Sequence, residues 1–332
     1  MTGMWVTLQH IRAARERIVG KVEHTPVVLS QSLSARSGSP VYLKFEHRQT
    51  TGSFKLRGAS NAIAELTPQQ RSHGVVAAST GNHGRALAHA ARLEGMRAVI
   101  CMSSLVPQNK LGAIRSLGAD VRIVGNSQDV AQQEVDRLVA EEGLVMLPPF
   151  DHPDIVAGQG TLGLEIMEQV PDAETILVPL SGGGLAAGVA AAVKGIRPNS
   201  RAIGISMARG AAMKASLDAG RPVQVEELPT LADSLGGGIG LDNRLTFAMC
   251  GNLLDDVILV SEDEIGAGIR HAHRREREIV EGAGAVGIGA LLAGKVSAKG
   301  PTVVFLTGGN IDMGLHRRVV SGDAEADPER VP

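Results

Sequence analysis

A lysine and three glycine-rich loops carry most of the chemistry that this sequence can offer. Lys55 lies in TGSFKLRG (51–58), and a lysine amine acts as a nucleophile or a base once its surroundings keep it neutral. The loops read STGNHG (79–84), SGGG (181–184) and TGGN (307–310). Each loop follows an apolar run and precedes a predicted helix, and in open α/β sheets anions bind at such places. The pattern predicts one polar, anion-holding cleft.

The SGGG loop admits more than one interpretation. Gly182, Gly184 and Ala187 match the dinucleotide fingerprint G-x-G-x-x-A. A dinucleotide site also needs an acid near the end of the next strand, and that predicted strand ends in GISM (204–207). A phosphate cradle fits better, because three glycines let backbone amides turn inward around a dianion. A non-catalytic nucleotide-binding module, and a glycine turn that only allows close helix–strand packing, remain alternatives.

Strands and helices that would hold these loops alternate along the chain. Apolar, β-branched runs predict eight buried parallel strands, at 41–45, 75–78, 98–101, 121–124, 176–178, 202–205, 257–260 and 303–306. Helix-period stretches that end at glycine lie between some of them, at 84–94, 109–117 and 129–142. A further helix at 59–66 is predicted to follow the turn that carries Lys55. This alternation predicts an α/β fold with open, doubly wound sheets.

The domain organisation follows from a proline-rich segment. Residues 147–153 contain three prolines and are a plausible crossover between two sheets. We therefore predict a small α/β domain at 46–152, inserted into a large α/β domain made of 1–45 and 153–320. The tail at 321–332, which is rich in Asp, Glu and Pro, is predicted to fray.

Composition excludes several classes of protein. No apolar run approaches the roughly 20 residues that a membrane-spanning helix needs, and the first nine residues do not resemble an export signal. A net charge of −2, with one Trp, one Tyr and five Phe, gives no support for nucleic-acid binding. Cys101 and Cys250 lie far apart without a metal-binding spacing. A cytoplasmic protein with a small-molecule substrate is the expectation.

Four segments, taken together and in order, resemble a known family. TGSFKLRGA, STGNHG, SGGG and TGGN are similar to the signatures of the fold-type II pyridoxal-phosphate (PLP) enzymes of the threonine/serine dehydratase family, and the likeness runs from about residue 10 to about residue 318. The resemblance implies a tryptophan-synthase-β-like fold of two doubly wound sheets with pyridoxal 5′-phosphate between the domains. A homodimer is also expected.

The resemblance assigns roles to individual residues. Lys55, flanked by Phe54, would bond the cofactor, Asn82 would contact its phenolic oxygen, and Thr307 would contact its ring nitrogen. The phosphate would be held by Ser181, Gly182, Gly183, Gly184 and Leu185. The substrate carboxylate would be held by Ser79, Thr80, Gly81, Asn82 and His83.

The activity implied is dehydration and deamination of a small hydroxy-amino acid to a keto acid and ammonia. Lys55 would take the α-proton, and the β-hydroxyl would then leave. Thr80 matches the position at which racemases of the family carry a catalytic serine, so an amino-acid racemase on the same cofactor stays an alternative. A β-replacement enzyme is another. His83 is either a proton-transfer residue or a capping or core histidine.

The substrate is least determined. The stretch LADSLGGG (231–238) departs from the family's Ala-Asp-Gly and, with STGNHG, looks closest to catabolic dehydratases of hydroxyectoine or 3-hydroxyaspartate use. GNSQD (125–129) lacks the cation expected beside a second carboxylate. A 3-hydroxyaspartate ammonia-lyase is therefore the less favoured alternative, because an unpaired carboxylate costs several kcal/mol. Threonine, serine or a hydroxy-amino acid with a neutral or cationic tail, as in hydroxyectoine catabolism, is preferred.

No metal is predicted. Ser206 and Ala212 occupy positions where metal-binding relatives carry carboxylates. His271 and His273 lie in a charge run at helical spacing, which is typical of a solvated helix face. Glu281 matches a family glutamate near the cofactor, and it could equally be an acid that stabilises a helix N-terminus.

Overall fold

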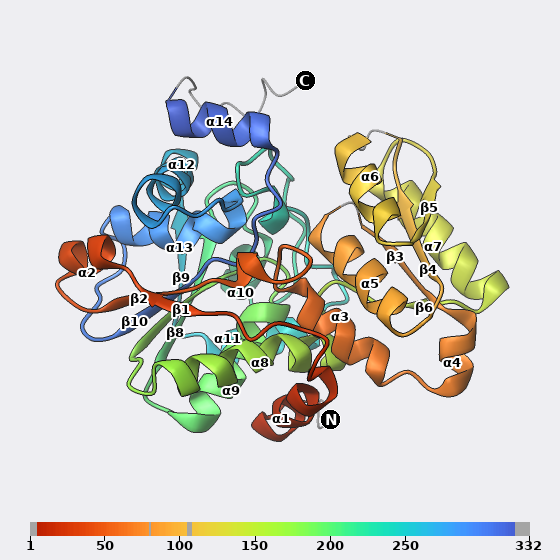
Figure 1. Cartoon of the computed structure of the whole chain (residues 1–332), viewed down its shortest axis with the longest axis horizontal. Helices are drawn as coiled ribbons and strands as arrows, with labels where there is room; N and C mark the ends of the chain where they lie inside the picture. Colours follow the sequence, from red (N-terminus) through yellow and green to blue (C-terminus); the bar gives the residue numbers. More distant parts are fainter. Residues whose placement is uncertain (1–4, 80, 105–107, 323–332) are drawn as a thin grey trace.

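Two β-sheets organise the chain in the computed structural model, which describes residues 5–79, 81–104 and 108–322. Six strands form the larger sheet in the order β1-β2-β10-β7-β8-β9, and four form the smaller in the order β5-β4-β3-β6. The predicted α/β fold with two sheets is confirmed. Figure 1 shows the two sheets in separate lobes, with α3 between them.

The strands agree closely with the eight predicted runs. Those of the larger sheet are β1 (Val27–Leu29), β2 (Val41–Lys44), β7 (Thr175–Pro179), β8 (Arg201–Met207), β9 (Asp256–Val260) and β10 (Thr302–Phe305). The smaller sheet contains β3 (Val75–Ala78), β4 (Ala98–Met102), β5 (Asp120–Ile123) and β6 (Val145–Met146). Every pairing is parallel except that of β1 with β2. The sequence missed β1 and β6, because runs of three and two residues are too short to show a period.

Two strand predictions are wrong in burial, and both strands lie at sheet edges: in β9 only Val260 is buried, and β5 is more exposed still. The run at 121–124 was expected to be a buried strand, but β5 is the edge of the smaller sheet, and its first and last residues, Asp120 and Ile123, are exposed. An edge strand has a neighbour on one side only, so its apolar residues need not be covered.

Helices cover both faces of each sheet. They are α1 (Leu8–Ile18), α2 (Gln31–Ser37), α3 (Lys55–Ala64), α4 (Pro68–His73), α5 (Asn82–Leu93), α6 (Gln108–Ser116), α7 (Gln128–Glu142), α8 (Pro153–Gln169), α9 (Gly184–Ile196), α10 (Ala212–Ala219), α11 (Leu245–Leu253), α12 (Glu262–His271), α13 (Gly282–Leu292) and α14 (Met313–Ser321), with short turns η1 (Glu46–Arg48), η2 (Asp233–Leu235) and η3 (Ala272–Glu276). On the larger sheet, α1, α8 and α9 cover one face and α2, α12 and α13 the other. On the smaller sheet, α3, α5 and α6 pack on one face and α7 on the other.

The helix that carries Lys55 begins earlier than predicted. The sequence favoured a helix at 59–66, whereas α3 begins at Lys55. No side chain caps its N-terminus. Instead, the Phe54 N–H donates to the carbonyl of Thr307 at 3.1 Å, so the end of β10 fixes where the helix starts. A tertiary contact of this kind leaves no local signal in the sequence.

Two glycines bring α3 and α8 into close contact. A Cβ on Gly158 would lie 2.6 Å from the carbonyl oxygen of Arg57, and a Cβ on Gly58 would lie 3.0 Å from that of Ile155. Side chains at these positions would push the helices apart. The helix of Lys55 is thereby packed directly on a helix of the larger sheet.

The segment after α12 is more constrained than the predicted solvated helix. α12 ends at His271 and continues as the π-helical turn η3, and Arg277 has a left-handed φ of 62°. His271 is half-buried and bonds Ser32 at 2.9 Å and Glu276 at 3.1 Å. His273 is exposed, as predicted.

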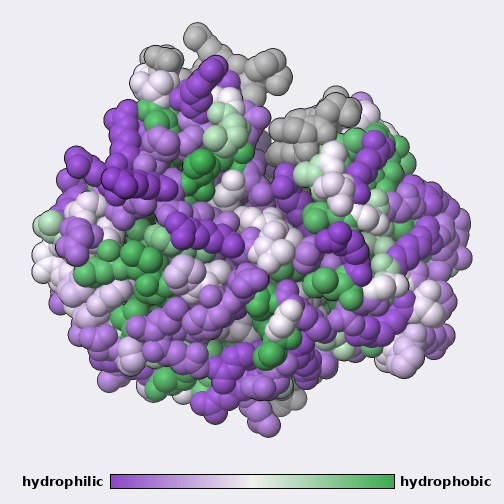
Figure 2. Space-filling model, viewed as in Figure 1, coloured by the Kyte–Doolittle hydropathy of each residue, from purple (hydrophilic) through white to green (hydrophobic). Residues whose placement is uncertain are grey.

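Surface and membrane features are simple. In the view of Figure 2 hydrophilic side chains cover most of the surface, and apolar ones gather in small, separate patches. Within the described part of the chain, no helix combines the length and the apolar character needed to cross a bilayer.

The domain division at 46–152 stays a prediction; β3 to β6 lie within that range. All but two residues of the tail at 321–332 lie outside the described residues.

Candidate functional site

The three loops and Lys55 meet at one cavity. Its volume is about 290 Å³, and its wall includes the residues that follow β3, β7 and β10. The predicted site residues on the wall are Phe54, Lys55, Ser79, Gly81, Asn82, His83, Ser181, Gly182, Gly183, Gly184, Leu185 and Thr307. Thr80 lies outside the described residues. The loops after β7 and β10 lie side by side because these parallel strands are neighbours in the larger sheet, and the loop after β3 reaches the same cavity from the smaller sheet.

Lys55 presents a reactive amine to this cavity. Its Nζ donates a hydrogen bond to the carbonyl oxygen of Pro149 at 2.8 Å and lies 5.3 Å from the centre of the Phe54 ring. Burial lowers the pKa of Lys55 to about 8, although the charge of Glu281 acts in the opposite direction. About a tenth of the amine is therefore neutral, and so nucleophilic, at pH 7, far more than for an ordinary lysine.

Reductive labelling of Lys55 with an aldehyde and borohydride is expected to reach half its maximal rate near pH 8 in the folded, cofactor-free protein. A lowered pKa means that the neutral amine is populated above about pH 8 and is lost below it. In the same protein unfolded by denaturant, the midpoint should move toward 10.5, the ordinary lysine value. Mass spectrometry of the Lys55 peptide measures both rates. A folded-state midpoint near 10.5 would contradict the assignment.

Asn82 is held by residues of the other lobe. Its side-chain nitrogen donates to Glu281 at 2.7 Å, and its oxygen accepts from Asn310 at 2.6 Å. Arg85 in turn donates to Asn310 at 3.0 Å. A Cβ on Gly308 would lie 2.3 Å from the Glu281 carboxylate, so a glycine is needed there. The amide of Asn82 is therefore fixed in orientation at the cavity wall.

Glu281 combines features of both of its predicted interpretations. It is the N-cap residue of α13, but its side chain makes no capping hydrogen bond. Instead the carboxylate faces the cavity, where it accepts from Asn82. This geometry favours a place beside a cofactor over a purely local helix-capping role.

His83 is held as a neutral imidazole. Its Nε2 is 2.8 Å from the carbonyl oxygen of Leu147, and because a carbonyl only accepts, Nε2 carries the hydrogen. Burial and the charge of Lys55 lower the pKa of His83 to about 4. Both observations favour the core-histidine interpretation over a proton-transfer role.

The glycine loop is shaped by packing as well as by its fit to an anion. Gly183 has φ of +91° and directly precedes α9, so the helix N-terminus opens onto the cavity. A Cβ on Gly182 would lie 2.3 Å from the ring of Phe150, and one on Gly183 would lie 2.8 Å from Met213 and 2.9 Å from Cys250. Backbone amides in this arrangement suit a phosphate. Close packing and anion binding therefore both require the glycines.

Further residues of the cavity wall had no role assigned to them from the sequence, although some lie in stretches that it had marked. Pro149 and Phe150 come from the segment interpreted as a crossover, and Gln128 begins α7. Asp233 and Ser234 lie in the LADSLGGG stretch that departs from the family pattern. That departure and the missing cation in GNSQD (125–129), which contains Gln128, were the signals in the sequence; a loop phenylalanine carries none.

The residues considered for a metal stay apart from this cavity. The hydroxyl of Ser206 lies 3.4 Å from the sulfur of Met207, and Ala212 begins α10. In the described ranges no three His, Cys, Asp or Glu side chains are grouped so that they could hold an ion. That the protein needs no metal stays a prediction.

Comparison with known proteins is consistent with this geometry. The model of the family described as "Pyridoxal-phosphate dependent enzyme" matches residues 18–308. A Sinorhizobium fredii protein named "Putative threonine dehydratase" is 65% identical over 98% of both chains. An "L-threonine ammonia-lyase" of Thermotoga maritima is 41% identical over 95% of this chain and 78% of its own length. Maize serine racemase superposes with a TM-score of 0.90 at 33% identity, covering 96% of this chain and 98% of the racemase.

Proposed function

The chain belongs to the fold-type II pyridoxal-phosphate-dependent enzymes of the threonine/serine dehydratase family, and on this basis we propose that it eliminates water and ammonia from a small hydroxy-amino acid. Its cofactor is pyridoxal 5′-phosphate, and the family is one of lyases. A non-catalytic nucleotide-binding module is thereby set aside. The observation that carries the proposal is the convergence of Lys55, Asn82, the glycine loop and Thr307 on one cavity.

The residues present fit the cofactor. Lys55 offers an amine for its aldehyde, and the loop from Ser181 to Leu185 offers amides and open space for its phosphate. Asn82 and Thr307 supply polar groups for the ring between these two points. When bound, pyridoxal phosphate supplies an electron sink that stabilises negative charge on the α-carbon of the substrate.

The protein's own residues then bind, orient and move protons. The amides of Ser79, Gly81 and Asn82, beside the N-terminus of α5, hold the substrate carboxylate. Lys55, whose pKa is near 8, takes the proton from the α-carbon. Thr307 would hold the ring nitrogen of the cofactor with a hydroxyl, where a carboxylate would keep that nitrogen protonated, so the ring would supply a milder electron sink that suits prompt loss of the β-hydroxyl.

The cavity wall supports a substrate without a second carboxylate. Gln128 lies where a cation would be needed, and it donates to the carbonyl of Ala78 at 3.0 Å. Asp233, a further acidic residue, also lines the wall. Among the described residues of the wall, Lys55 is the one lysine or arginine, so a second carboxylate beside Gln128 would lose its water without gaining a cationic partner there, at a cost of several kcal/mol. We therefore favour threonine, serine or a hydroxy-amino acid with a neutral or cationic tail, such as one derived from hydroxyectoine, over 3-hydroxyaspartate.

The PLP-loaded enzyme is expected to release ammonia and a keto acid from threonine, serine or a cationic hydroxy-amino acid without an added thiol. Assays at equal concentration, with both β-carbon configurations, rank kcat/KM across this panel and 3-hydroxyaspartate. Because one unpaired carboxylate costs several kcal/mol, we expect 3-hydroxyaspartate to be at least about 30-fold poorer than the best substrate. Strict dependence on a thiol would indicate β-replacement, and a kcat/KM for 3-hydroxyaspartate far above all others would contradict the substrate proposal.

Racemisation is the second candidate activity. It is favoured by the likeness to maize serine racemase and by the hydroxyl of Thr80 at the matching position. Chiral analysis of unreacted substrate in the same assays distinguishes it: conversion of one enantiomer into the other without ammonia indicates a racemase. A homodimer and a cytoplasmic location stay predictions.

A further inference from the structure

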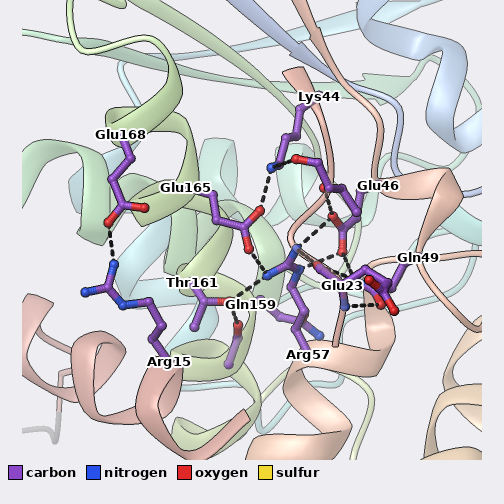
Figure 3. Close-up of polar contacts among 12 residues, drawn as sticks. Arg15, Glu23, Lys44, Glu46, Gln49, Arg57, Gln159, Thr161, Glu165 and Glu168 are labelled. Atoms are coloured by element: carbon purple, nitrogen blue, oxygen red, sulfur yellow. Dashed lines mark hydrogen bonds and ion pairs between the residues drawn. The ribbon is translucent and has the colours of Figure 1, made fainter. Parts of the chain in front are cut away.

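A cluster of four buried charges adjoins the helix that carries Lys55. Figure 3 shows the guanidinium of Arg57 between the carboxylates of Glu46 and Glu165, with Lys44 on the other side of Glu165. All four side chains are less than a tenth exposed. They come from α3, η1, α8 and β2, so the cluster joins the helix of Lys55 to the body of the larger sheet.

Arg57 uses its whole guanidinium in this cluster. Its Nε and Nη2 donate to the two oxygens of Glu46 at 2.6 and 3.1 Å, and its Nη1 donates to Glu165 at 2.5 Å. Nη1 also reaches Thr161 at 3.3 Å, and Nη2 reaches the carbonyl of Glu23 at 3.0 Å. A planar fork bound on several sides allows one orientation, which a lysine could not reproduce.

Lys44 completes the charge balance without touching α3. Its amine donates to Glu165 at 2.5 Å, to the carbonyl of Thr25 at 2.6 Å and to Gln169 at 2.9 Å. Although burial acts to raise it, Arg57 and Lys44 hold the pKa of Glu165 below its usual value. Two cations thus face two carboxylates, and removal of one leaves a buried charge unpaired.

The first turn of α3 is held by tertiary contacts such as the ion pairs of Arg57. It has no side-chain cap and no acidic residue in its first turn. Side chains two residues apart on a helix point to different sides. Lys55 therefore lines the cavity, whereas Arg57 is not part of the cavity wall and points toward Glu46 and Glu165. The turn is therefore held between its cavity contacts and the charge cluster.

We propose that Arg57 is a positioning residue for Lys55, which fixes the first turn of α3 against Glu46 and Glu165 so that the amine meets the cofactor site. Arg57 is not among the charges that shift the pKa of Lys55, so its influence is one of position. The inference rests on the proposed role of Lys55 as the reactive amine. It concerns the protein before any substrate is bound.

The test compares Arg57→Met with two matched variants. Lys44→Met removes a charge from the same cluster without a contact to α3, and Arg15→Met removes a more exposed ion pair with Glu168 on α8. In each cofactor-free protein, acetylation of Lys55 is followed against pH by mass spectrometry, well below the Tm measured by circular dichroism. Arg57→Lys, which keeps the charge but loses the fork, is measured alongside.

Loss of position should let water reach the amine. For Arg57→Met we expect the acetylation midpoint of Lys55 to rise by at least one pH unit, a tenfold loss of neutral amine below the midpoint, with partial recovery in Arg57→Lys. Lys44→Met should lower the Tm but leave the midpoint within 0.3 unit, about a twofold change, and Arg15→Met should change neither. An unchanged midpoint in Arg57→Met, or an equal shift in Lys44→Met, would overturn the proposal.

If Arg57→Met does not fold, Glu46→Gln provides a second test of the same proposal. Glu46→Gln keeps the shape of the cluster and weakens the grip on two of the guanidinium nitrogens. It should raise the Lys55 midpoint by at least half a unit, a threefold effect, and an unchanged midpoint in folded Glu46→Gln also overturns the inference. None of these readings requires turnover. Absence of ammonia release would therefore sink the proposed function while leaving the test of Arg57 interpretable.

Discussion

Lys55→Ala is expected to lower kcat/KM for the best substrate by at least about 10³-fold, because general base catalysis alone contributes about 10²–10⁴-fold and the covalent bond to the cofactor is lost as well. Lys55→Arg should be almost as poor, since a guanidinium stays charged and cannot bond an aldehyde. Steady-state assays at saturating pyridoxal phosphate measure both. Absorbance above 400 nm, present in the parent protein, should be absent from both variants.

The control for this result is a lysine outside the cavity. Lys194 pairs with Asp255 at the surface, and Lys194→Ala should retain full activity and colour. Borohydride reduction of the parent protein with its cofactor should tag the Lys55 peptide alone. A Lys55→Ala enzyme that retains a tenth of the parent activity, or a tag on another lysine, would refute the assignment.

Gly183→Ala is expected to weaken pyridoxal-phosphate binding by at least about tenfold and to lower the Tm. Left-handed backbone costs a residue with a Cβ about 1–2 kcal/mol, and about 1.4 kcal/mol is a factor of ten. The new methyl would also lie 2.8 Å from Met213 and 2.9 Å from Cys250, so the loop must shift away from these two side chains and from its present place in the cavity wall. Titration of the cofactor followed by absorbance gives the Kd, and thermal unfolding of the cofactor-free protein gives the Tm.

Gly220→Ala separates backbone strain from the position of the loop. Gly220 also has a left-handed φ, +68°, but it caps α10 and nothing lies within 4 Å of its added Cβ. It should lose some stability and keep the parent Kd for pyridoxal phosphate. If Gly183→Ala binds the cofactor as tightly as Gly220→Ala does, the loop does not hold the phosphate.

Features that repeat along the chain were predictable. The eight predicted strands were found because each is a short run of three to five residues, mostly apolar and rich in β-branched side chains. The glycine loops were found for a related reason: a cluster of glycines after a strand is visible in a short stretch of sequence and marks a place where backbone approaches another group closely. Because anions bind beyond the carboxyl ends of such strands, the three loops predicted one cleft, whereas the place of Lys55 beside them followed from the resemblance to the family.

Features that depend on partners distant in sequence were not predictable. α3 begins at Lys55 because the Phe54 N–H meets Thr307, about 250 residues later, and no capping residue records this. β5 was expected to be buried and is an edge, because the order of strands in a sheet is not written in any one strand. Phe150 reached the glycine loop from a segment that the sequence marked only as a crossover.

The sequence by itself determined the chemistry that is available: an amine, amide-rich loops and their order, since these follow from residue types and local periods. Only the tertiary structure decided the protonation of these groups and which charges are paired. It lowered the pKa of Lys55 to about 8 and that of His83 to about 4, because burial depends on what packs around a group. It also balanced Arg57 and Lys44 against Glu46 and Glu165, since charges from four separate elements can be paired only after the chain has folded.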